Sequence, residues 1–170
     1  MPGSGKSLVS NKAVERGAIM VSMGDIIREK AEERGETTGQ TAENLRKEYG
    51  QYIVSELTIE KIKKLQNEGY EKIVVDGIRS HNEVELFKEN FENFMIVSVF
   101  TNPSLRFERL KNRKREDDTE DYGQFVVRDK RELGFGLGNV IALSDKIIIN
   151  ESDMESYNEK IEEFLNEIDF

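Results

Sequence analysis

Short runs rich in Ile, Val or Phe alternate along the chain with longer stretches in which apolar residues recur at helical spacing. This alternation is typical of βα units, in which parallel strands form a sheet and helices cover it. The expected strands are residues 18–22, 72–76, 95–101 and 146–149. Because all four are strongly apolar, we expect both of their faces to be buried. The pattern therefore predicts an α/β fold.

Helical spacing and composition predict helices between these strands and after the last one. They span residues 7–16, 25–34, 41–68, 82–91, 103–114, 122–133 and 154–168. The last helix has one apolar face, which predicts packing against the sheet; its members are Tyr157, Ile161, Phe164, Leu165 and Ile168. Residues 32–40, with two glycines and two threonines, predict a mobile connection, and residues 115–121 form a second. The glycines of residues 134–138 indicate a helix end and a tight turn before residues 140–142.

Composition narrows the class of protein. The 170 residues fit a single domain spanning 1–170. The absence of Cys excludes thiol nucleophiles, disulfides and Cys metal sites, and the single His81 cannot form a multi-His metal site. The longest apolar stretch, residues 94–100, is far below the ~20 residues of a membrane helix. We therefore expect a soluble cytoplasmic protein without a membrane partner.

Net charge argues against general nucleic-acid binding. The chain has 34 acidic and 25 basic residues, a net charge of −9, so its surface as a whole repels a phosphate backbone. One basic run stands apart and indicates a local anion site, with Arg109 and Arg113 on one helix face; it comprises Arg106, Arg109, Lys111, Arg113, Lys114 and Arg115. The alternative is a solvated helix face balanced by the acids at residues 116–118.

The strongest motif lies at the start of the chain. Pro2-Gly3-Ser4-Gly5-Lys6-Ser7 leads into a helical pattern, as the second half of G-x-x-x-x-G-K-[S/T] does. Glycines let backbone N–H groups turn toward phosphate oxygens, Lys6 neutralises phosphate charge, and the Ser7 hydroxyl suits Mg²⁺. The motif predicts a site for ATP and Mg²⁺. Its first Gly would lie two residues before Met1, after a buried strand, so we expect the first strand to be missing from this sequence.

Two carboxylates follow predicted strands. Asp76 ends the second strand, where a carboxylate can hold Mg²⁺ through water; the alternative is a turn residue before Gly77. Asp25 follows the first strand and can orient or deprotonate an acceptor hydroxyl, or cap the next helix; the two roles are compatible. Arg28, one turn later, can bind an acceptor anion or form part of a solvated face.

With Pro2–Ser7, Val75-Asp76-Gly77 and Arg109-x-x-x-Arg113-x-Arg115-x-Asp117-Asp118 in this order, the chain resembles the adenylate kinase and dephospho-CoA kinase group of P-loop kinases. It resembles more closely an archaeal family of P-loop kinase-like proteins related to them. The resemblance covers essentially the whole chain and implies a five-stranded, nucleoside monophosphate kinase-like parallel sheet flanked by helices. It also implies an acceptor-binding helical segment at about residues 25–70 and a short lid at about 113–130.

The same resemblance implies roles for single residues. Asp25 would serve the acceptor hydroxyl, and Arg79 would bind the acceptor phosphate, although the Asp-Gly-x-Pro-Arg signature is here one residue short and lacks its Pro. Arg109 would stack on adenine, with Asn150 in the loop at the adenine edge. The clamp on the transferring phosphates would consist of Arg113, Arg115 and Arg128.

Together these features favour an ATP-dependent phosphotransferase that moves the γ-phosphoryl group of Mg·ATP to a small anionic acceptor, with dephospho-CoA first and AMP second. A nucleotide-dependent ATPase or regulatory binding module is the alternative, because a phosphate loop does not by itself define the reaction. A factor acting on RNA would need a basic groove with exposed aromatics, and only residues 106–115 hint at one. The oligomeric state is not indicated by the sequence.

Overall fold

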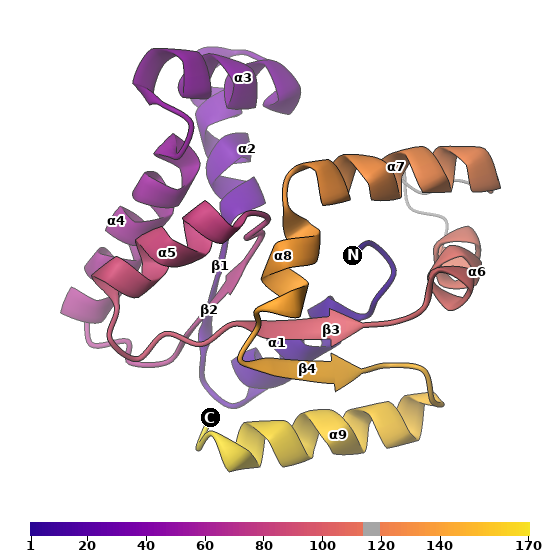
Figure 1. The fold of residues 1–170 in the computed structure, drawn as a ribbon. Coiled ribbons are helices and arrows are strands. Elements are labelled where there is room, and N and C mark those ends of the chain that lie inside the picture. Colours follow the sequence, from indigo (N-terminus) through magenta and orange to yellow (C-terminus); the bar gives the residue numbers. More distant parts are fainter. Residues whose placement is uncertain (114–119) are drawn as a thin grey trace. The chain divides into compact units, whose positions relative to one another are not determined.

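The computed structural model describes residues 1–113 and 120–170, and it confirms an α/β chain with all four predicted strands (Figure 1). In chain order its elements are α1 (Lys6–Glu15), β1 (Ile19–Ser22), α2 (Met23–Arg34), α3 (Thr38–Tyr49), α4 (Ile53–Asn67), β2 (Ile73–Asp76), α5 (His81–Asn90), β3 (Val97–Phe100), α6 (Pro103–Arg113), α7 (Tyr122–Gly134), α8 (Leu137–Ala142), β4 (Lys146–Ile149) and α9 (Met154–Glu167).

The strands pair in parallel. β1 and β2 run in register from Ile19 opposite Ile73 to Ser22 opposite Asp76, and β3 and β4 pair in the same way. Parallel neighbours need a crossover, which α2, α3 and α4 supply for the first pair and α6, α7 and α8 for the second. The described strands therefore form two parallel pairs, β1 with β2 and β3 with β4.

The chain divides into two compact units. Unit 1 comprises Met1–Lys12, Arg79–His81 and Met95–Phe170, and unit 2 comprises Ala13–Ile78 and Asn82–Phe94. The core of unit 2 brings β1, α2, α4 and α5 together; its buried members are Val21, Met23, Ile26, Val54, Ile59, Ile62 and Phe87. In unit 1, α9 packs on β4 through its predicted apolar face, of which Tyr157, Ile161, Phe164 and Leu165 are buried.

The prediction of one helix over residues 41–68 is wrong, because α3 ends at Tyr49 and α4 begins at Ile53. Gly50 lies between them with φ 109°, a conformation that only glycine adopts readily. A single glycine leaves the helical spacing of the flanking residues unchanged, so the pattern does not reveal the break.

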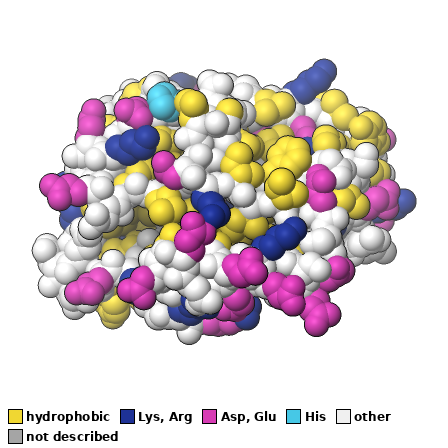
Figure 2. Space-filling model, turned by 60° about the horizontal axis from the view of Figure 1, so that its bottom comes forward, with side chains coloured by type: hydrophobic (Ala, Val, Ile, Leu, Met, Phe, Trp, Pro, Cys, Tyr) yellow, Lys and Arg dark blue, Asp and Glu magenta, His cyan; other side chains and the backbone are white. Residues whose placement is uncertain are grey.

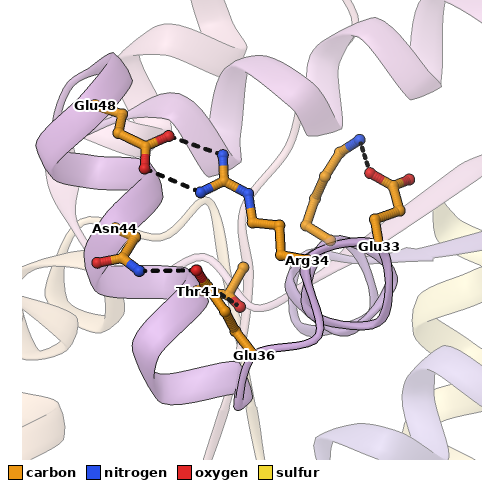
Figure 3. A network of polar contacts seen from close by, with 7 residues as sticks. Glu33, Arg34, Glu36, Thr41, Asn44 and Glu48 are labelled. Carbon is orange, nitrogen blue, oxygen red and sulfur yellow. Dashed lines mark hydrogen bonds and ion pairs between the residues drawn. The ribbon is translucent and has the colours of Figure 1, made fainter.

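Capping and polar contacts join α2 and α3 at the connection predicted between them. α2 ends at Gly35 in the left-handed conformation, and Thr37 forms a capping box with Gln40 at the start of α3. Glu36 accepts hydrogen bonds of 3.1 Å from both Thr41 and Asn44, as Figure 3 shows.

A second contact joins the same two helices. The Arg34 guanidinium donates two hydrogen bonds, of 3.1 and 2.9 Å, to the carboxylate of Glu48 (Figure 3). These bonds lower the pKa of Glu48 and raise that of Arg34, since each partner favours the charged form of the other. The end of α2 is thus tied to the end of α3.

The strands are not buried on both faces as predicted. Met20, Phe100, Ile147 and Ile149 are 43–51% exposed, whereas Ile148, between the last two, is 4% exposed. Successive side chains of a strand point to opposite faces, so one face of β4 is covered and the other is open to solvent in this chain.

The glycine-rich residues 134–138 form the expected helix end and turn, with Gly136 left-handed at φ 99°. Residues 140–142, which follow this turn, belong to the short helix α8. Across the described ranges 1–113 and 120–170, every helix is too short or too polar to cross a bilayer.

Candidate functional site

The phosphate-loop motif forms a tight turn that leads into α1, and two of its glycines are required by the backbone. Gly3 and Gly5 have φ values of 78° and 92°. A Cβ atom at Gly3 would lie 2.8 Å from the Arg106 carbonyl oxygen, and one at Gly5 would lie 2.3 Å from Asn150 Nδ2. Conformation and close approach therefore both demand glycine at these two positions.

The carbonyl oxygen of Ser4 is held by residues that follow β3 and β4. It accepts a 2.8 Å hydrogen bond from Asn150 Nδ2 and lies 3.1 Å from the Thr101 hydroxyl, which is also 2.9 Å from the Asn150 carbonyl oxygen. All three residues are buried. The ends of both strands of the β3–β4 sheet thus bind the loop backbone.

The carbonyl oxygen of Pro2 is held from α6. It accepts a 3.2 Å hydrogen bond from Arg106 Nη1. Arg106 is 3% exposed, forms a two-pronged ion pair with Asp129 of α7, and lies over the Phe125 ring at 5.1 Å. The prediction that Arg106 contributes to a local anion site is wrong, because Asp129 already neutralises its buried charge.

A third anchor comes from α9. The Tyr157 hydroxyl donates a 3.1 Å hydrogen bond to the carbonyl oxygen of Gly5. Burial raises the pKa of Tyr157 to about 12, because it disfavours the phenolate more than the Arg109 charge favours it. Tyr157 therefore stays a donor over the whole physiological pH range.

These anchors leave the amide side of the loop for a ligand. Within the described part of the chain, the amides of Gly3, Gly5 and Ser7 have no hydrogen-bond acceptor. Lys6 and Ser7 are exposed and form the first turn of the ten-residue helix α1. Amide groups and a helix N-terminus, with a lysine in its first turn, are groups that can bind phosphate oxygens.

Arg109 and Asn150, predicted at the nucleotide base, contact each other in the structure. Arg109 donates to the Asn150 carbonyl oxygen at 3.1 Å and to its side-chain Oδ1 at 3.2 Å. Asn150 is 4% exposed, so its amide group positions the loop rather than facing solvent. The hydrogen bonds of Arg109 lie in the guanidinium plane, which is compatible with stacking on a face of that plane.

The two described arginines of the predicted phosphate clamp lie on different helices and differ in exposure. Arg113 is the exposed last residue of α6, and Arg128 is half-buried on α7. Arg115 lies outside the described residues, as does most of the first half of the predicted lid at about residues 113–130.

Three predicted residues lie in unit 2. Asp25 occupies the first turn of α2 and forms an ion pair with Arg28, while Ser22 is the N-cap, accepting from the Asp25 amide at 3.2 Å. The alternative of Asp25 as the capping residue is therefore wrong. Asp76 is the last residue of β2 and is paired in register with Ser22. Asp25 and Asp76 thus follow the two strands at the carboxyl edge of the same sheet.

Arg79 belongs to unit 1, where its Nη1 lies 3.4 Å from Glu132 Oε2 of α7. Glu132 is 6% exposed, and its other oxygen accepts a 3.1 Å hydrogen bond from Arg131. The predicted acceptor arginine therefore has a carboxylate partner of its own.

Metal binding by protein side chains alone is not indicated: the described residues contain no group of three or more His, Asp or Glu arranged around one point. The predicted metal residues are Ser7 and Asp76, one hydroxyl and one carboxylate. Such a sparse donor set suits Mg²⁺, which keeps several waters and binds phosphate oxygens.

Sequence reasoning missed four residues that support the loop: Thr101, Arg106, Asp129 and Tyr157. Arg106 was noted only as part of the basic run, and Tyr157 only as part of an apolar helix face. The contacts of Thr101, Arg106 and Tyr157 with the loop span 97–152 residues of sequence, and Asp129 acts through Arg106, 23 residues away. No local sequence pattern predicts such contacts.

The surface agrees with the acidic composition. In Figure 2, acidic side chains are spread over the visible face, and the basic ones lie among them with hydrophobic side chains between. On this face the charges are mixed and do not form one large basic surface.

The sequence of this chain matches one family model and several relatives. A family model described as an AAA domain matches residues 1–123. A UPF0200 protein of Methanothermobacter thermautotrophicus is 45% identical over 168 residues, covering 99% of this chain and 87% of the relative. A UPF0200 protein of Thermococcus onnurineus is 42% identical over 175 residues, covering 99% and 94%.

Among solved structures, shikimate kinase from Bacteroides thetaiotaomicron matches with a TM-score of 0.54 and 14% sequence identity, covering 99% of this chain and 94% of the kinase. At this identity the likeness shows the fold alone. It confirms the prediction of a P-loop kinase-like α/β fold.

Proposed function

We propose that this chain, which belongs to the UPF0200 family and has a P-loop kinase-like fold, binds Mg·ATP at residues 2–7 and transfers its γ-phosphoryl group to a small anionic acceptor.

One observation carries the proposal: the carbonyl oxygens of the phosphate loop are held by side chains of unit 1. Pro2, Ser4 and Gly5 are bound by Arg106, by Asn150 with Thr101, and by Tyr157, respectively. A loop held on its carbonyl side presents its amides in a fixed arrangement, so little reorganisation is needed when phosphate binds. This preorganisation is what charge stabilisation of a transferring phosphoryl group requires.

In the proposed reaction an acceptor oxygen, from a hydroxyl or a phosphate group, attacks the γ-phosphorus, and the bond between that phosphorus and the β–γ bridging oxygen breaks to release ADP. Where the nucleophile is a hydroxyl, its proton passes to Asp25. Lys6 neutralises charge on the β- and γ-phosphates, and Arg109 stacks on the base with Asn150 beside it. Ser7 and Asp76 would be the protein partners of a bound Mg²⁺, which would supply further positive charge for the phosphates.

The acceptor would be held by α2 to α4, the segment of about residues 25–70. Arg28 and Arg79 would bind its anionic groups, and Arg113, Arg115 and Arg128 of the segment 113–130 would clamp the transferring phosphates. Dephospho-CoA and nucleoside monophosphates are the acceptor classes to test first, because each offers a hydroxyl or phosphate nucleophile beside an anionic group.

A second candidate is a nucleotide-dependent ATPase or regulatory module. It is favoured by one observation, that both acceptor arginines already have carboxylate partners, Arg28 with Asp25 and Arg79 with Glu132. In that case water would attack the γ-phosphorus in place of the acceptor, and the rate of ADP release would not change when candidate acceptors are added.

The test is ADP release from Mg·ATP with dephospho-CoA, AMP, shikimate or no acceptor. We expect release that depends on dephospho-CoA or AMP, that Lys6→Ala abolishes and that Asp25→Asn strongly reduces while ATP affinity stays unchanged. Lys88→Ala on α5 is the matched control and should behave as wild type. Turnover that requires Lys6 but ignores every acceptor would favour the ATPase, and no Lys6-dependent turnover or ATP binding would refute both.

A further inference from the structure

Arg79 lies in a three-residue segment that belongs to unit 1. Residues 79–81 belong to unit 1, although the segments before and after them, Ala13–Ile78 and Asn82–Phe94, belong to unit 2. Gly136, in the turn between α7 and α8, lies beside this segment. A Cβ built on Gly136 would lie 3.7 Å from Ser80 Cα and 3.8 Å from the Arg79 carbonyl oxygen. The backbone of Arg79 is thus in contact with the end of α7.

The side chain of Arg79 is held on two sides by residues at the end of α7. Its Nη1 lies 3.4 Å from Glu132 Oε2, and its guanidinium carbon lies 5.7 Å from the centre of the Phe135 ring. The ion pair restrains one edge of the guanidinium, and the ring covers one face. An arginine with this support keeps fewer rotamers than an isolated surface arginine.

Glu132 is the unusual member of this group. Its side chain is 8% exposed, whereas Arg79 and Arg131, which bind its two oxygens, are 51% and 61% exposed. Acidic side chains are seldom buried without a partner. Arg79 is therefore the more buried of the two arginines on this carboxylate, yet about half of its side chain is still accessible to an anion.

We propose that Glu132 is a positioning residue that holds Arg79 ready for the anionic group, a phosphate or carboxylate, of the acceptor. This inference rests on the proposed function. Preorganisation of a long side chain lowers the entropic cost of binding, and removing it weakens acceptor binding without touching the ATP site.

The two possible roles of Glu132 predict opposite changes in acceptor binding when its charge is removed. If Glu132 served only as a counter-ion, its negative charge would compete with the acceptor for Arg79, and Glu132→Gln would tighten acceptor binding. If Glu132 positions Arg79, the same isosteric change raises the KM for the acceptor. The sign of the change in KM decides between the two.

The experiment measures kcat and KM for dephospho-CoA and AMP, and KM for ATP, in wild type and four variants. We expect Glu132→Gln to raise the acceptor KM roughly five- to tenfold, with kcat and the ATP KM within about twofold. Arg79→Lys, which keeps the charge but loses the planar fork, should raise the acceptor KM at least as much. Glu167→Gln, which removes an exposed Glu–Lys pair on α9, is the matched control and should leave all constants unchanged.

The double variant Arg79→Lys/Glu132→Gln tests whether Glu132 acts through Arg79. We expect its acceptor KM to equal that of Arg79→Lys within about twofold, because the second change removes support from a side chain already replaced. Fully multiplicative effects would overturn the inference, as would an unchanged or lower acceptor KM in Glu132→Gln. Should Glu132→Gln fold poorly, an unchanged acceptor KM in the exposed Arg79→Lys variant would overturn it instead.

Failure of the proposed function looks different. If no acceptor stimulates ATP turnover by the wild-type protein, the phosphotransferase proposal fails and this inference fails with it. Acceptor-dependent turnover combined with an unchanged acceptor KM in the variants refutes the role of Glu132 alone.

Discussion

The side-chain amide of Asn150 donates a 2.8 Å hydrogen bond to the carbonyl oxygen of Ser4 across 146 residues of sequence. This contact ties the end of β4 to the phosphate loop. Asn150 also accepts hydrogen bonds from Arg109 and the Thr101 hydroxyl, and its backbone amide donates to the Phe100 carbonyl oxygen at 2.8 Å. One buried residue thus joins the loop, α6 and both strands of the β3–β4 sheet.

Asn150→Ala should therefore weaken both the fold and nucleotide binding. It leaves the buried Ser4 carbonyl and the Arg109 guanidinium with fewer partners, which we expect to cost about 1–3 kcal/mol of unfolding free energy. ATP affinity should fall roughly tenfold, a loss of ~1.4 kcal/mol in binding. Urea unfolding and calorimetric ATP titration measure the two effects. Asn139→Ala, at an exposed position of α8, is the control, and equal behaviour of the two variants would contradict the anchoring role.

Gly5→Ala should abolish ATP binding, whereas Gly17→Ala should not. The two glycines have nearly the same φ, 92° and 94°, so both substitutions incur left-handed strain of about 1–2 kcal/mol. Only at Gly5 would the new Cβ meet a close neighbour, Asn150 Nδ2 at 2.3 Å; nothing lies within 4 Å at Gly17. Thermal unfolding and ATP titration of both variants separate strain from steric conflict. Retained ATP affinity in Gly5→Ala would show that the loop tolerates displacement of Asn150.

Asp129→Asn should destabilise the protein by about 3–5 kcal/mol, because it leaves the buried Arg106 charge without its carboxylate partner. The side chains of Arg106 and Asp129 are 4% and 14% exposed. Denaturant unfolding monitored by circular dichroism measures the change. Glu48→Gln breaks the Arg34–Glu48 pair at the surface and should shift the midpoint far less, since water screens exposed charges. A smaller shift for Asp129→Asn than for Glu48→Gln would contradict the importance of burial.

Stability should fall at high pH through Tyr157. Its pKa is about 12 in the folded protein, above the ordinary value of 10, because burial disfavours the phenolate. Above pH 10 the unfolded chain loses this proton while the folded chain retains it, so the Tyr157 contribution declines as pH rises toward 12. Unfolding free energies between these pH values should decline more steeply for wild type than for Tyr157→Phe. The difference in phenolate absorbance between the two proteins reports the Tyr157 titration directly, and a midpoint near the ordinary value would refute the assignment.

Features that depend on neighbouring residues could be predicted from the sequence. The alternation of apolar runs and helical spacing was enough for the α/β class and all four strands, because strand and helix formation depends on near neighbours. The run Gly3 to Ser7 was enough for the phosphate loop, because its function depends on contiguous backbone groups. The break at Gly50 escaped the pattern, since one glycine is tolerated inside many helices.

The contacts that hold the phosphate loop, and the different roles of the arginines near it, become visible only in the folded chain. Arg106 and Arg109 lie one turn apart on α6, yet Arg106 is buried against Asp129 and the Pro2 carbonyl, while Arg109 holds Asn150. Likewise, Glu132 gave no signal in the sequence but is the carboxylate partner of Arg79. A hydrogen bond or ion pair between distant residues depends on where folding brings their side chains, and no local pattern of residues reveals that distance.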